Sequence, residues 1–298
     1  MRKILFIVNP VAGGGRPNAL IPIIENRMKD SNIEFKIINT TKPKEAIKIA
    51  EENVDEFSVI VAVGGDGTIN EVAKGLINSK RGTLGIIPGG TGNDMSKSLG
   101  LSQDPNEALD AIIQNITKSM DIGSVNGIHF LNIASIGFDA ETVKNTEGIK
   151  RRIKGKSAYI LGVITTLLTY RKKHISLLID DIEYNRNFLL LAVGNGGFYG
   201  GGMKILPMAV IDDGYFNICI IKDVSNLKIL FLFPSIFKGN HLKYTKYIDI
   251  FKAKKVIVKD VSDAIINLDG ELIKNNQDDI VFDVKDYKLE VITNRFKY

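Results

Sequence analysis

The most informative stretch of the sequence is Val59-Ile-Val-Ala-Val-Gly-Gly-Asp-Gly-Thr-Ile-Asn-Glu-Val-Ala73. An apolar run is followed by three glycines around Asp66, and then by apolar residues at the spacing of an amphipathic helix. This order predicts a buried strand, a tight turn and a helix. Backbone N–H groups at the start of such a helix attract phosphate oxygens. Because the carboxylate of Asp66 repels phosphate, a divalent metal is expected to offset its charge.

The same alternation of strand and helix extends over the N-terminal part of the chain, up to about Ile122. Each expected strand is followed by a loop rich in glycine, asparagine or threonine. Alternating strands and helices predict an α/β domain with a parallel sheet, whose ligands bind beyond the carboxyl ends of the strands. The loops therefore predict one binding site at one edge of the sheet. The expected strands are 4–8, 35–38, 59–63 and 84–87.

The pattern changes after Ile122. Short strand patterns separated by turns predict a second, β-rich and antiparallel domain, interrupted by a segment, 147–173, that is expected to be helical at its core. The expected strands are 130–134, 175–180, 187–193, 215–221, 255–259, 265–268 and 287–293.

Composition and charge limit the kinds of partner and compartment that we expect, but they do not identify one function. The formal net charge is +5 and the pI is about 9.0, which suits anionic partners such as nucleotides or acidic lipids. The single cysteine, Cys219, excludes an internal disulfide and favours a reducing compartment. No run reaches the roughly 18 apolar residues of a membrane span, and no signal-peptide cleavage site is evident. We therefore expect a cytoplasmic protein.

The common nucleotide-binding fingerprints are absent. A Walker motif before Gly155-Lys156-Ser157 would need a glycine where Lys150 stands. The pair Gly65 and Gly67 lacks the third glycine of a dinucleotide-binding motif.

Five motifs, in order, instead resemble the diacylglycerol kinase and sphingosine kinase superfamily, in particular its bacterial soluble members. The Gly64-Gly65-Asp66-Gly67-Thr68 turn is similar to the nucleotide signature of that superfamily, whose core NAD kinases and phosphofructokinases share. Together the motifs cover nearly the whole chain. They are Asn9 to Gly14, Gly64 to Glu71, Pro88 to Asp94, Asp212 to Gly214 and Leu268 to Glu271.

The resemblance implies a kinase that moves the γ-phosphoryl group of ATP to a lipid hydroxyl, with diacylglycerol as the leading acceptor. It places the general base at Glu271, with Asp269 as a second catalytic acid that would share its face if the segment is extended. It also implies that Asp66 helps to bind a catalytic Mg²⁺. The ATP contacts that we expect are Asn9, Gly13, Gly14, Arg16, Thr40, Gly64, Gly65, Asp66, Gly67, Thr68, Ile69, Asn70, Thr91 and Asn93.

The resemblance implies further metal contacts. A structural metal would be held by the carboxylate of Asp213 and by the backbone carbonyls of Val210 and Tyr215. Asp94 and Asp121 would lie near the network of water molecules around the catalytic metal.

The resemblance also divides the chain. It implies an ATP-binding domain at 1–122 with 286–298, of the kind found in NAD kinases and phosphofructokinases. A β-sandwich-like lipid domain would span 123–285.

Two basic, apolar segments suggest peripheral contact with an anionic membrane. In the first, Lys150, Arg151 and Arg152 precede an apolar run that ends before Arg171. In the second, Phe231 to Phe237 is followed by Lys238 and Lys243. The first run also has the alternative interpretation of a core helix with solvated ends. A homodimer is possible, and no nucleic-acid partner is expected.

Three alternatives remain open from the sequence. In the first, the enzyme is a kinase of another lipid alcohol, such as phosphatidylglycerol, monoacylglycerol or a sphingoid base. Alternatively, the chain is an NAD kinase-like enzyme with a soluble acceptor, or a nucleotide- or lipid-binding regulator without turnover. Asp66 and Glu271 argue against the regulator, because a protein that only binds needs no base.

Overall fold

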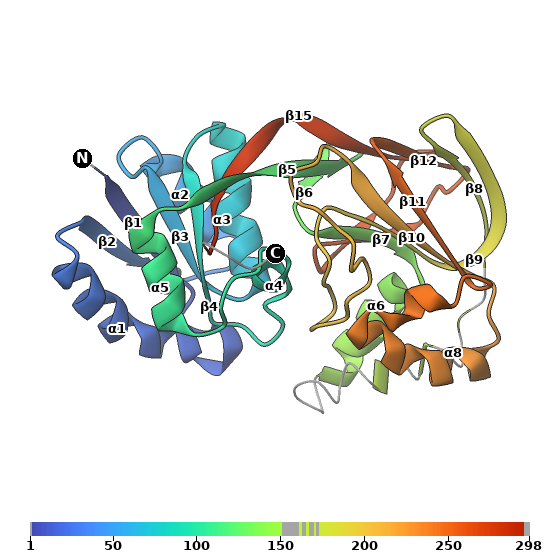
Figure 1. Ribbon diagram of the computed structural model, residues 1–298, viewed down its shortest axis with the longest axis horizontal. Coiled ribbons are helices and arrows are strands. Elements are labelled where there is room, and N and C mark those ends of the chain that lie inside the picture. The colour runs from blue at the N-terminus through green and yellow to red at the C-terminus, as the bar shows by residue number, and fades with distance from the viewer. Residues whose placement is uncertain (1, 151–160, 163–164, 167–169, 171–172, 295–298) are drawn as a thin grey trace. The chain divides into compact units, whose positions relative to one another are not determined.

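The computed structural model describes residues 2–150, 161–162, 165–166, 170 and 173–294 (Figure 1). The chain divides into two compact units. Unit 1 comprises Met1–Asp121 and Tyr287–Tyr298, and unit 2 comprises Ile122–Asp286. Each boundary lies one residue from a boundary expected from the sequence. The roles expected for the two parts, in ATP binding and in lipid binding, stay predictions.

Unit 1 contains a parallel sheet with the strand order β15-β4-β3-β1-β2. Strand β3 is buried along its whole length and β1 is buried from Ile4 onward, as expected of a parallel sheet that is covered on both faces. The strands are β1 (Lys3–Val8), β2 (Glu34–Asn39), β3 (Val59–Gly64), β4 (Thr83–Pro88) and the end of β15 (Ile280–Ile292).

Helices connect these strands and cover the sheet. Phe6, Val61 and Ile87 pack in one buried cluster with Ile24 of α1 and Leu109 of α5. The carboxylate of Asp104 caps α5 by accepting from the N–H groups of Asn106 and Glu107. The helices are η1 (Ala12–Gly14), α1 (Arg16–Asp30), α2 (Glu45–Asn53), α3 (Asp66–Ser79), α4 (Asp94–Ser98) and α5 (Pro105–Gln114).

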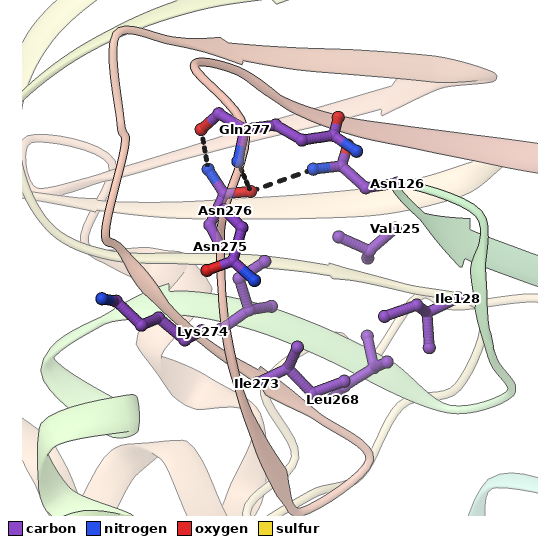
Figure 2. A pocket seen from close by; sticks show the side chains of 10 residues that line it. Val125, Asn126, Ile128, Leu268, Ile273, Lys274, Asn275, Asn276 and Gln277 are labelled. Carbon is purple, nitrogen blue, oxygen red and sulfur yellow. Dashed lines mark hydrogen bonds between the residues drawn. The ribbon is translucent and has the colours of Figure 1, made fainter.

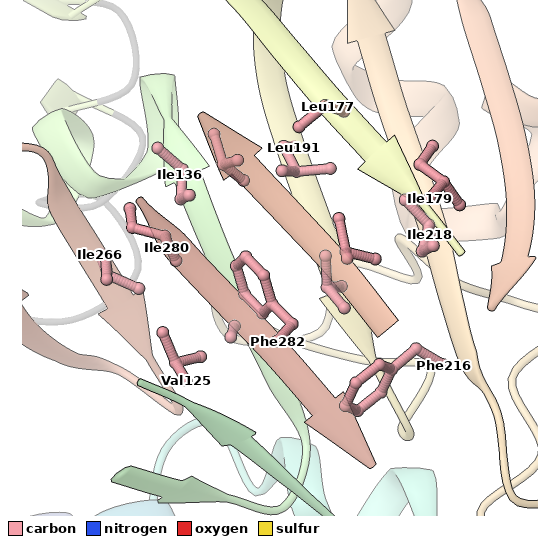
Figure 3. Close-up of a cluster of buried hydrophobic side chains, with 14 of the residues drawn as sticks. Val125, Ile136, Leu177, Ile179, Leu191, Phe216, Ile218, Ile266, Ile280 and Phe282 are labelled. Atoms are coloured by element: carbon pink, nitrogen blue, oxygen red, sulfur yellow. The ribbon is translucent and has the colours of Figure 1, made fainter. Parts of the chain in front are cut away.

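Unit 2 is built from antiparallel strands around an apolar core (Figure 3). The rings of Phe130 and Phe216 stack in this core, with their centroids 5.5 Å apart. The strand order is β14-β13-β7-β9-β8-β12-β15, and β10 pairs with β9 and β11. The strands are the end of β5 (Thr117–Val125), β6 (Ile128–Phe130), β7 (Ile133–Gly137), β8 (Lys173–Ile179), β9 (Ile182–Gly194), β10 (Phe216–Lys222), β11 (Ile248–Ala253), β12 (Lys255–Lys259), β13 (Ile265–Leu268), β14 (Glu271–Lys274) and the start of β15.

Among the described residues of unit 2, the helices whose bounds the structure gives are α6 (Phe138–Lys150), α8 (Asn226–Leu232), η2 (Phe233–Lys238) and η3 (Asn240–Lys243). Residues 161–162 and 165–166 are also helical. Most of the expected helical segment 147–173, with its basic residues, lies outside the described residues. Among the helices that the structure does describe, none is long and apolar enough to cross a membrane.

The expected parallel α/β part and β-rich part are confirmed, but one expected strand is wrong. The run 130–134 is divided between β6 and β7, with a break at Leu131 and Asn132. At the break, backbone N–H groups point to the carboxylate of Asp269 rather than to a neighbouring strand. A hydrogen-bond acceptor that is distant in sequence thus overrides the local strand pattern.

Candidate active site

The glycine loops of unit 1 approach one another at the carboxyl ends of its parallel strands. A Cβ atom at Gly90 would lie 2.5 Å from the Cα atom of Gly65, and a Cβ atom at Gly13 would collide with the carbonyl oxygen of Gly89. The N–H of Gly89 also donates to the carbonyl oxygen of Gly64 at 2.7 Å. The loops after β1, β3 and β4 therefore meet, and glycine is required where they do.

Polar side chains link the same loops. The Nδ2 of Asn9 donates to the hydroxyl oxygen of Thr68 at 3.1 Å, which joins the loop after β1 to α3. The Oδ1 of Asn93 accepts from the N–H of Gly90 at 2.9 Å. After β2, the N–H of Thr40 donates to the carbonyl oxygen of Val8 at 2.8 Å. The structure thus brings together the residues after β1, β2, β3 and β4 that the sequence predicts to contact ATP.

A cleft of about 450 Å³ lies beside the loop after β4. Arg16, Thr91 and Asn93, which are three of the expected ATP contacts, line it together with Lys97. Lys97 was not anticipated from the sequence, although its place on α4, three residues after Asp94, was a usable signal. Its ammonium donates to the carbonyl oxygen of Gly92 at 2.6 Å. Arg16 and Lys97 give the cleft two cations, which suits an anionic ligand.

Gly67 differs from the other glycines of its turn. A Cβ atom at Gly64 would lie 2.6 Å from the hydroxyl oxygen of Thr68, so packing requires glycine there. A Cβ atom at Gly67, in contrast, would meet no atom within 4 Å. Protein packing therefore does not explain glycine at position 67, whereas a ligand that approaches the first turn of α3 would.

The carboxylate of Asp66 lies in the first turn of α3, next to the start of α4. Its Oδ1 accepts from the N–H of Met95 at 3.1 Å. Asp94, the residue before Met95, is itself buried. A carboxylate oxygen is a donor that Mg²⁺ prefers, and this arrangement fits a magnesium ion held mainly through water.

Asp121 lies elsewhere in unit 1, on β5, and is 1% exposed. The ammonium of Lys288, on β15, lies 2.8 Å from its Oδ1. A lysine therefore already balances this charge, and the place of Asp121 in a metal–water network stays a prediction.

The turn expected to hold a structural metal is also occupied by protein contacts. The Oδ2 of Asp213 lies 2.8 Å from the ammonium of Lys252, and its Oδ1 accepts from the N–H of Tyr215 at 3.0 Å. The ammonium groups of Lys252 and Lys254 lie 5.1 and 5.2 Å from the centre of the Tyr215 ring. Two lysine ammonium groups at this turn would repel a divalent metal ion. The contacts of Val210, Asp213 and Tyr215 to a metal stay predictions.

In unit 2, Asp269 and Gly270 form the two-residue turn between β13 and β14. Both have positive φ, 50° and 94°, as the favoured hairpin turns require. The carboxylate of Asp269 accepts from the backbone N–H groups of Leu131, Asn132 and Ile133, at 2.7, 2.9 and 2.9 Å. The segment is thus not extended at Asp269. The condition under which Asp269 would share a face with Glu271 is not met, because its carboxylate points to the break between β6 and β7.

A second set of hydrogen bonds supports the same turn. The Oδ1 of Asn267 accepts from the N–H of Gly270 at 3.0 Å, and its Nδ2 donates to the carboxylate of Asp139 at 3.1 Å. The hydroxyl of Ser135 also donates to this carboxylate. Burial raises the pKa of Asp139, against the opposing effect of these hydrogen bonds. Asp139 and Asn267 could not be identified from the sequence, since their partners lie far away in the chain.

Glu271 is the first residue of β14 and pairs with Leu268 of β13. Residues that pair across a hairpin share a face, as do residues two positions apart on a strand. Glu271 therefore lies on the face of the hairpin that carries Leu268 and Ile273. Both of these side chains line a pocket of about 130 Å³ in unit 2 (Figure 2).

The pocket in Figure 2 is lined by apolar side chains, by amide side chains and by Lys274. Asn275 links the amide residues: its Nδ2 donates to the carbonyl oxygen of Gln277 at 2.6 Å, and its Oδ1 accepts from the Nδ2 of Asn126 at 3.1 Å. The apolar side chains are Val125, Ile128, Ile266, Leu268 and Ile273.

Two known families match the chain. Residues 3–125 match the diacylglycerol kinase catalytic domain, and residues 132–292 match the YegS C-terminal NAD kinase beta sandwich-like domain. This confirms the expected α/β domain followed by a β-sandwich-like domain.

Curated relatives match over nearly the whole chain. A diacylglycerol kinase of Bacillus subtilis is 31% identical over 91% of this chain and 90% of the relative. One of Staphylococcus saprophyticus is 30% identical over 91% of this chain and 89% of the relative.

Solved structures agree with these matches. A diacylglycerol kinase of Bacillus anthracis superimposes with a TM-score of 0.77 and 25% identity, covering 99% of this chain and 97% of that one. An NAD kinase of Archaeoglobus fulgidus, at 15% identity and a TM-score of 0.54 over 99% of this chain and 94% of that one, shares the fold alone. On both the family matches and the curated relatives, the chain belongs to the bacterial diacylglycerol kinase family of lipid kinases.

Proposed function

We propose that the protein transfers the γ-phosphoryl group of ATP to the free hydroxyl of diacylglycerol, giving phosphatidic acid and ADP. The observation that carries this proposal is the hairpin of β13 and β14. Asp269 and Asn267 hold its turn, and the turn leads directly into Glu271, beside an apolar pocket.

Unit 1 supplies the ATP contacts in this proposal. The glycine loops offer backbone N–H groups to phosphate oxygens without obstruction by Cβ atoms. Two cations balance the phosphate charge in the cleft that they line. Arg16 was expected from the sequence, and Lys97 was not. Open space at Gly67 leaves room for a phosphate at the first turn of α3.

Asp66 is proposed to hold Mg²⁺ through water. Asp94 lies next to this site in the chain, because the residue after it, Met95, donates its N–H to the carboxylate of Asp66. When bound, Mg²⁺ would offset the negative charge of the transferred phosphoryl group. The N–H of Met95 donates to one carboxylate oxygen of Asp66 and so restricts the orientation of that carboxylate.

Glu271 is proposed as the general base. Its carboxylate takes the proton of the acceptor hydroxyl as that oxygen forms a bond to the γ-phosphorus, while the bond from the γ-phosphorus to the bridging oxygen of ADP breaks. Asp269 then has a positioning role, because its carboxylate is engaged by three N–H groups.

A lipid acceptor is favoured over a soluble one by the surroundings of Glu271. The side chains that share its hairpin face are apolar and line a pocket. Such a lining suits an acceptor with a hydrocarbon part better than the polar surface of NAD. The diacylglycerol kinases among the relatives support the choice of acceptor within the lipids.

One assay tests the proposal. Purified protein receives γ-labelled ATP and magnesium with mixed micelles of diacylglycerol, monoacylglycerol, ceramide or phosphatidylglycerol, and in parallel with soluble NAD. We expect label in phosphatidic acid. Label in another lipid would replace the acceptor and keep the lipid kinase. Label in NAD, or in no product, would contradict the proposal.

Peripheral contact with an anionic membrane belongs to the same proposal, because the acceptor is a membrane lipid. The homodimer stays a prediction.

A further inference from the structure

An apolar, solvent-exposed patch lies on α8 and η2 of unit 2, beside α6 in Figure 1. Phe231 is 78% exposed, Leu230 is 49% exposed and Phe237 is 44% exposed. Exposed phenylalanines and leucines that are grouped together mark an interaction site more often than scattered ones do. With four lysines, Lys228, Lys238, Lys243 and Lys246, these three residues make up what we call the α8 face.

The α8 face is anchored from beneath. Ile229 packs in one cluster with Phe138 of α6 and Leu189 of β9, and Ile236 packs in the neighbouring cluster with Ile205. The rings of Phe233 and Phe237 are in edge contact, with their centroids 5.7 Å apart. The core side of these short helices is thus buried, and their exposed apolar side chains are presented outward.

Within the segment that carries the patch, the charged side chains have one sign. The segment 224–248 contains the four lysines and neither aspartate nor glutamate. All four lysines are exposed. The ammonium of Lys228 lies over the ring of Tyr247, 5.5 Å from its centre, and also donates to its hydroxyl at 3.2 Å. Exposed apolar side chains and lysines in one segment, whose nearest acids in the chain are Asp223 and Asp249 beyond its two ends, complement a surface that is hydrocarbon inside and anionic outside.

We propose that the α8 face docks on the surface of an anionic lipid bilayer, with Leu230, Phe231 and Phe237 entering the interface and the four lysines contacting lipid headgroups. This inference rests on the proposed function, because it names the surface by which a lipid kinase reaches a membrane-borne acceptor. A bilayer is the occupant that this charge pattern fits: long lysine side chains keep their charge at the headgroups while apolar side chains are buried.

Sedimentation with vesicles, without ATP, tests the docking. Vesicles contain phosphatidylcholine alone or mixed with phosphatidylserine. We expect the full chain to bind the anionic vesicles more tightly, and Leu230→Ser with Phe231→Ser to weaken this binding about tenfold or more, since each buried apolar side chain contributes that much. Lys238→Gln and Lys243→Gln each weaken it about fivefold at low salt, and less at high salt.

Two matched controls accompany these variants. Ile182→Ser replaces an apolar side chain that is 56% exposed elsewhere in unit 2, and Lys29→Gln replaces an exposed lysine of unit 1. Both are expected to bind as the unchanged chain does. Thermal unfolding of every variant shows that the substitutions leave the fold intact.

A second readout separates docking from turnover. With dihexanoylglycerol dissolved as monomers, the Leu230→Ser and Phe231→Ser variant is expected to keep its rate, and with vesicle-borne diacylglycerol it is expected to lose it. Unchanged vesicle binding by this variant would overturn the inference and leave the proposed function standing. A changed oligomeric state with unchanged vesicle binding would also overturn it and assign the α8 face to a second copy of the chain. Docking without phosphorylation of any lipid would support the α8 face and contradict the proposed function.

Discussion

At the scale of single residues, two acids of one motif have different surroundings. The carboxylate of Asp269 accepts three backbone hydrogen bonds at the break between β6 and β7. Glu271 begins the next strand on the face that lines a pocket. An acceptor that is engaged by three donors is a poor base, so the geometry separates a positioning acid from a candidate catalytic one.

Asp269→Ala is expected to destabilise the protein by about 2–4 kcal/mol, since it leaves three buried N–H groups without their acceptor. Turnover should fall as well, because the turn before Glu271 loses its support. The measurement is urea unfolding together with the lipid kinase assay.

Asp263→Ala is the matched control. Asp263 also has a positive φ, 65°, but its partner is the exposed Lys274. The backbone strain of alanine is therefore shared by both variants, and the loss of its exposed ion pair is expected to change the stability of the control little. Equal losses of unfolding free energy in the two variants would show that the hydrogen bonds to the carboxylate of Asp269 add no stability.

His241 makes stability depend on pH. Its ring is buried, its Nε2 lies 3.0 Å from the carbonyl oxygen of Ile205, and burial lowers its pKa from 6.5. The unfolded chain therefore binds the proton more tightly, so the stability from this residue is complete above the unfolded pKa and is lost as pH falls through it.

His241→Gln is expected to reduce the loss of unfolding free energy between about pH 7.5 and pH 5.5, because glutamine can still donate to Ile205 and does not titrate. Urea unfolding at both pH values measures it. His174→Gln, at an exposed histidine, serves as the control and should keep the pH dependence of the unchanged chain. The same dependence in both variants would contradict the assignment to His241.

At the scale of elements, the glycine loops after β1, β3 and β4 combine two requirements. Gly13, Gly65 and Gly90 are glycines because backbones meet there. Gly67 lies on the first turn of α3 and faces open space. Close packing and ligand access are thus assigned to different glycines of the same motifs.

Gly67→Ala is expected to fold normally and to gain up to about 1 kcal/mol, because alanine is the better helix former. Its affinity for ATP should nevertheless fall, since the new methyl group occupies space proposed for a phosphate. Calorimetric titration with ATP and thermal unfolding measure the two effects.

Gly90→Ala gives the contrast, because its Cβ atom would lie 2.5 Å from the Cα atom of Gly65. This variant should lose both stability and affinity. Unchanged ATP affinity in Gly67→Ala would remove the first turn of α3 from the proposed site.

The elements also show which parts of the fold could be predicted from the sequence. Strands β1, β3 and β4 are nearly continuous apolar runs, and their glycine loops identified the site edge. Strand β14 is only partly buried, so its four residues carry no such pattern, and β15 begins before the run that was recognised. Burial on both faces leaves a signal in the sequence, whereas partial burial does not.

Long-range contacts explain the remaining differences. The bond between Asn132 and Asp269 spans 137 positions of the chain, and the bond between Asn267 and Asp139 spans 128. No local pattern reveals such partners. The motif therefore predicted the candidate acids, and only the fold shows which of them is engaged by the backbone.

At the scale of the whole molecule, two strands belong to both units. The unit boundaries fall inside β5 and inside β15. In unit 1 the end of β15 pairs with β4, and its Lys288 lies 2.8 Å from the Oδ1 of Asp121 on β5. The last part of the chain is therefore an integral part of unit 1.

Lys288→Met is expected to destabilise the protein by about 1–3 kcal/mol, since it leaves the buried carboxylate of Asp121 without this cation and the half-exposed lysine limits the loss. Urea unfolding measures the change. Lys3→Met, whose partners Glu34 and Glu56 are exposed, is the control and should change the stability little. A smaller loss in Lys288→Met than in the control would contradict this role of the C-terminal strand.

The central claim is that the chain phosphorylates a lipid hydroxyl with Glu271 as the base. The most direct measurement is the rate of transfer of label from γ-labelled ATP to vesicle-borne diacylglycerol, by the unchanged chain and by Glu271→Gln, with ATP affinity measured for both. We predict labelled phosphatidic acid from the unchanged chain, a rate lower by about 10²–10⁴-fold in Glu271→Gln, and equal ATP affinities. An equal rate from the two proteins would contradict the account.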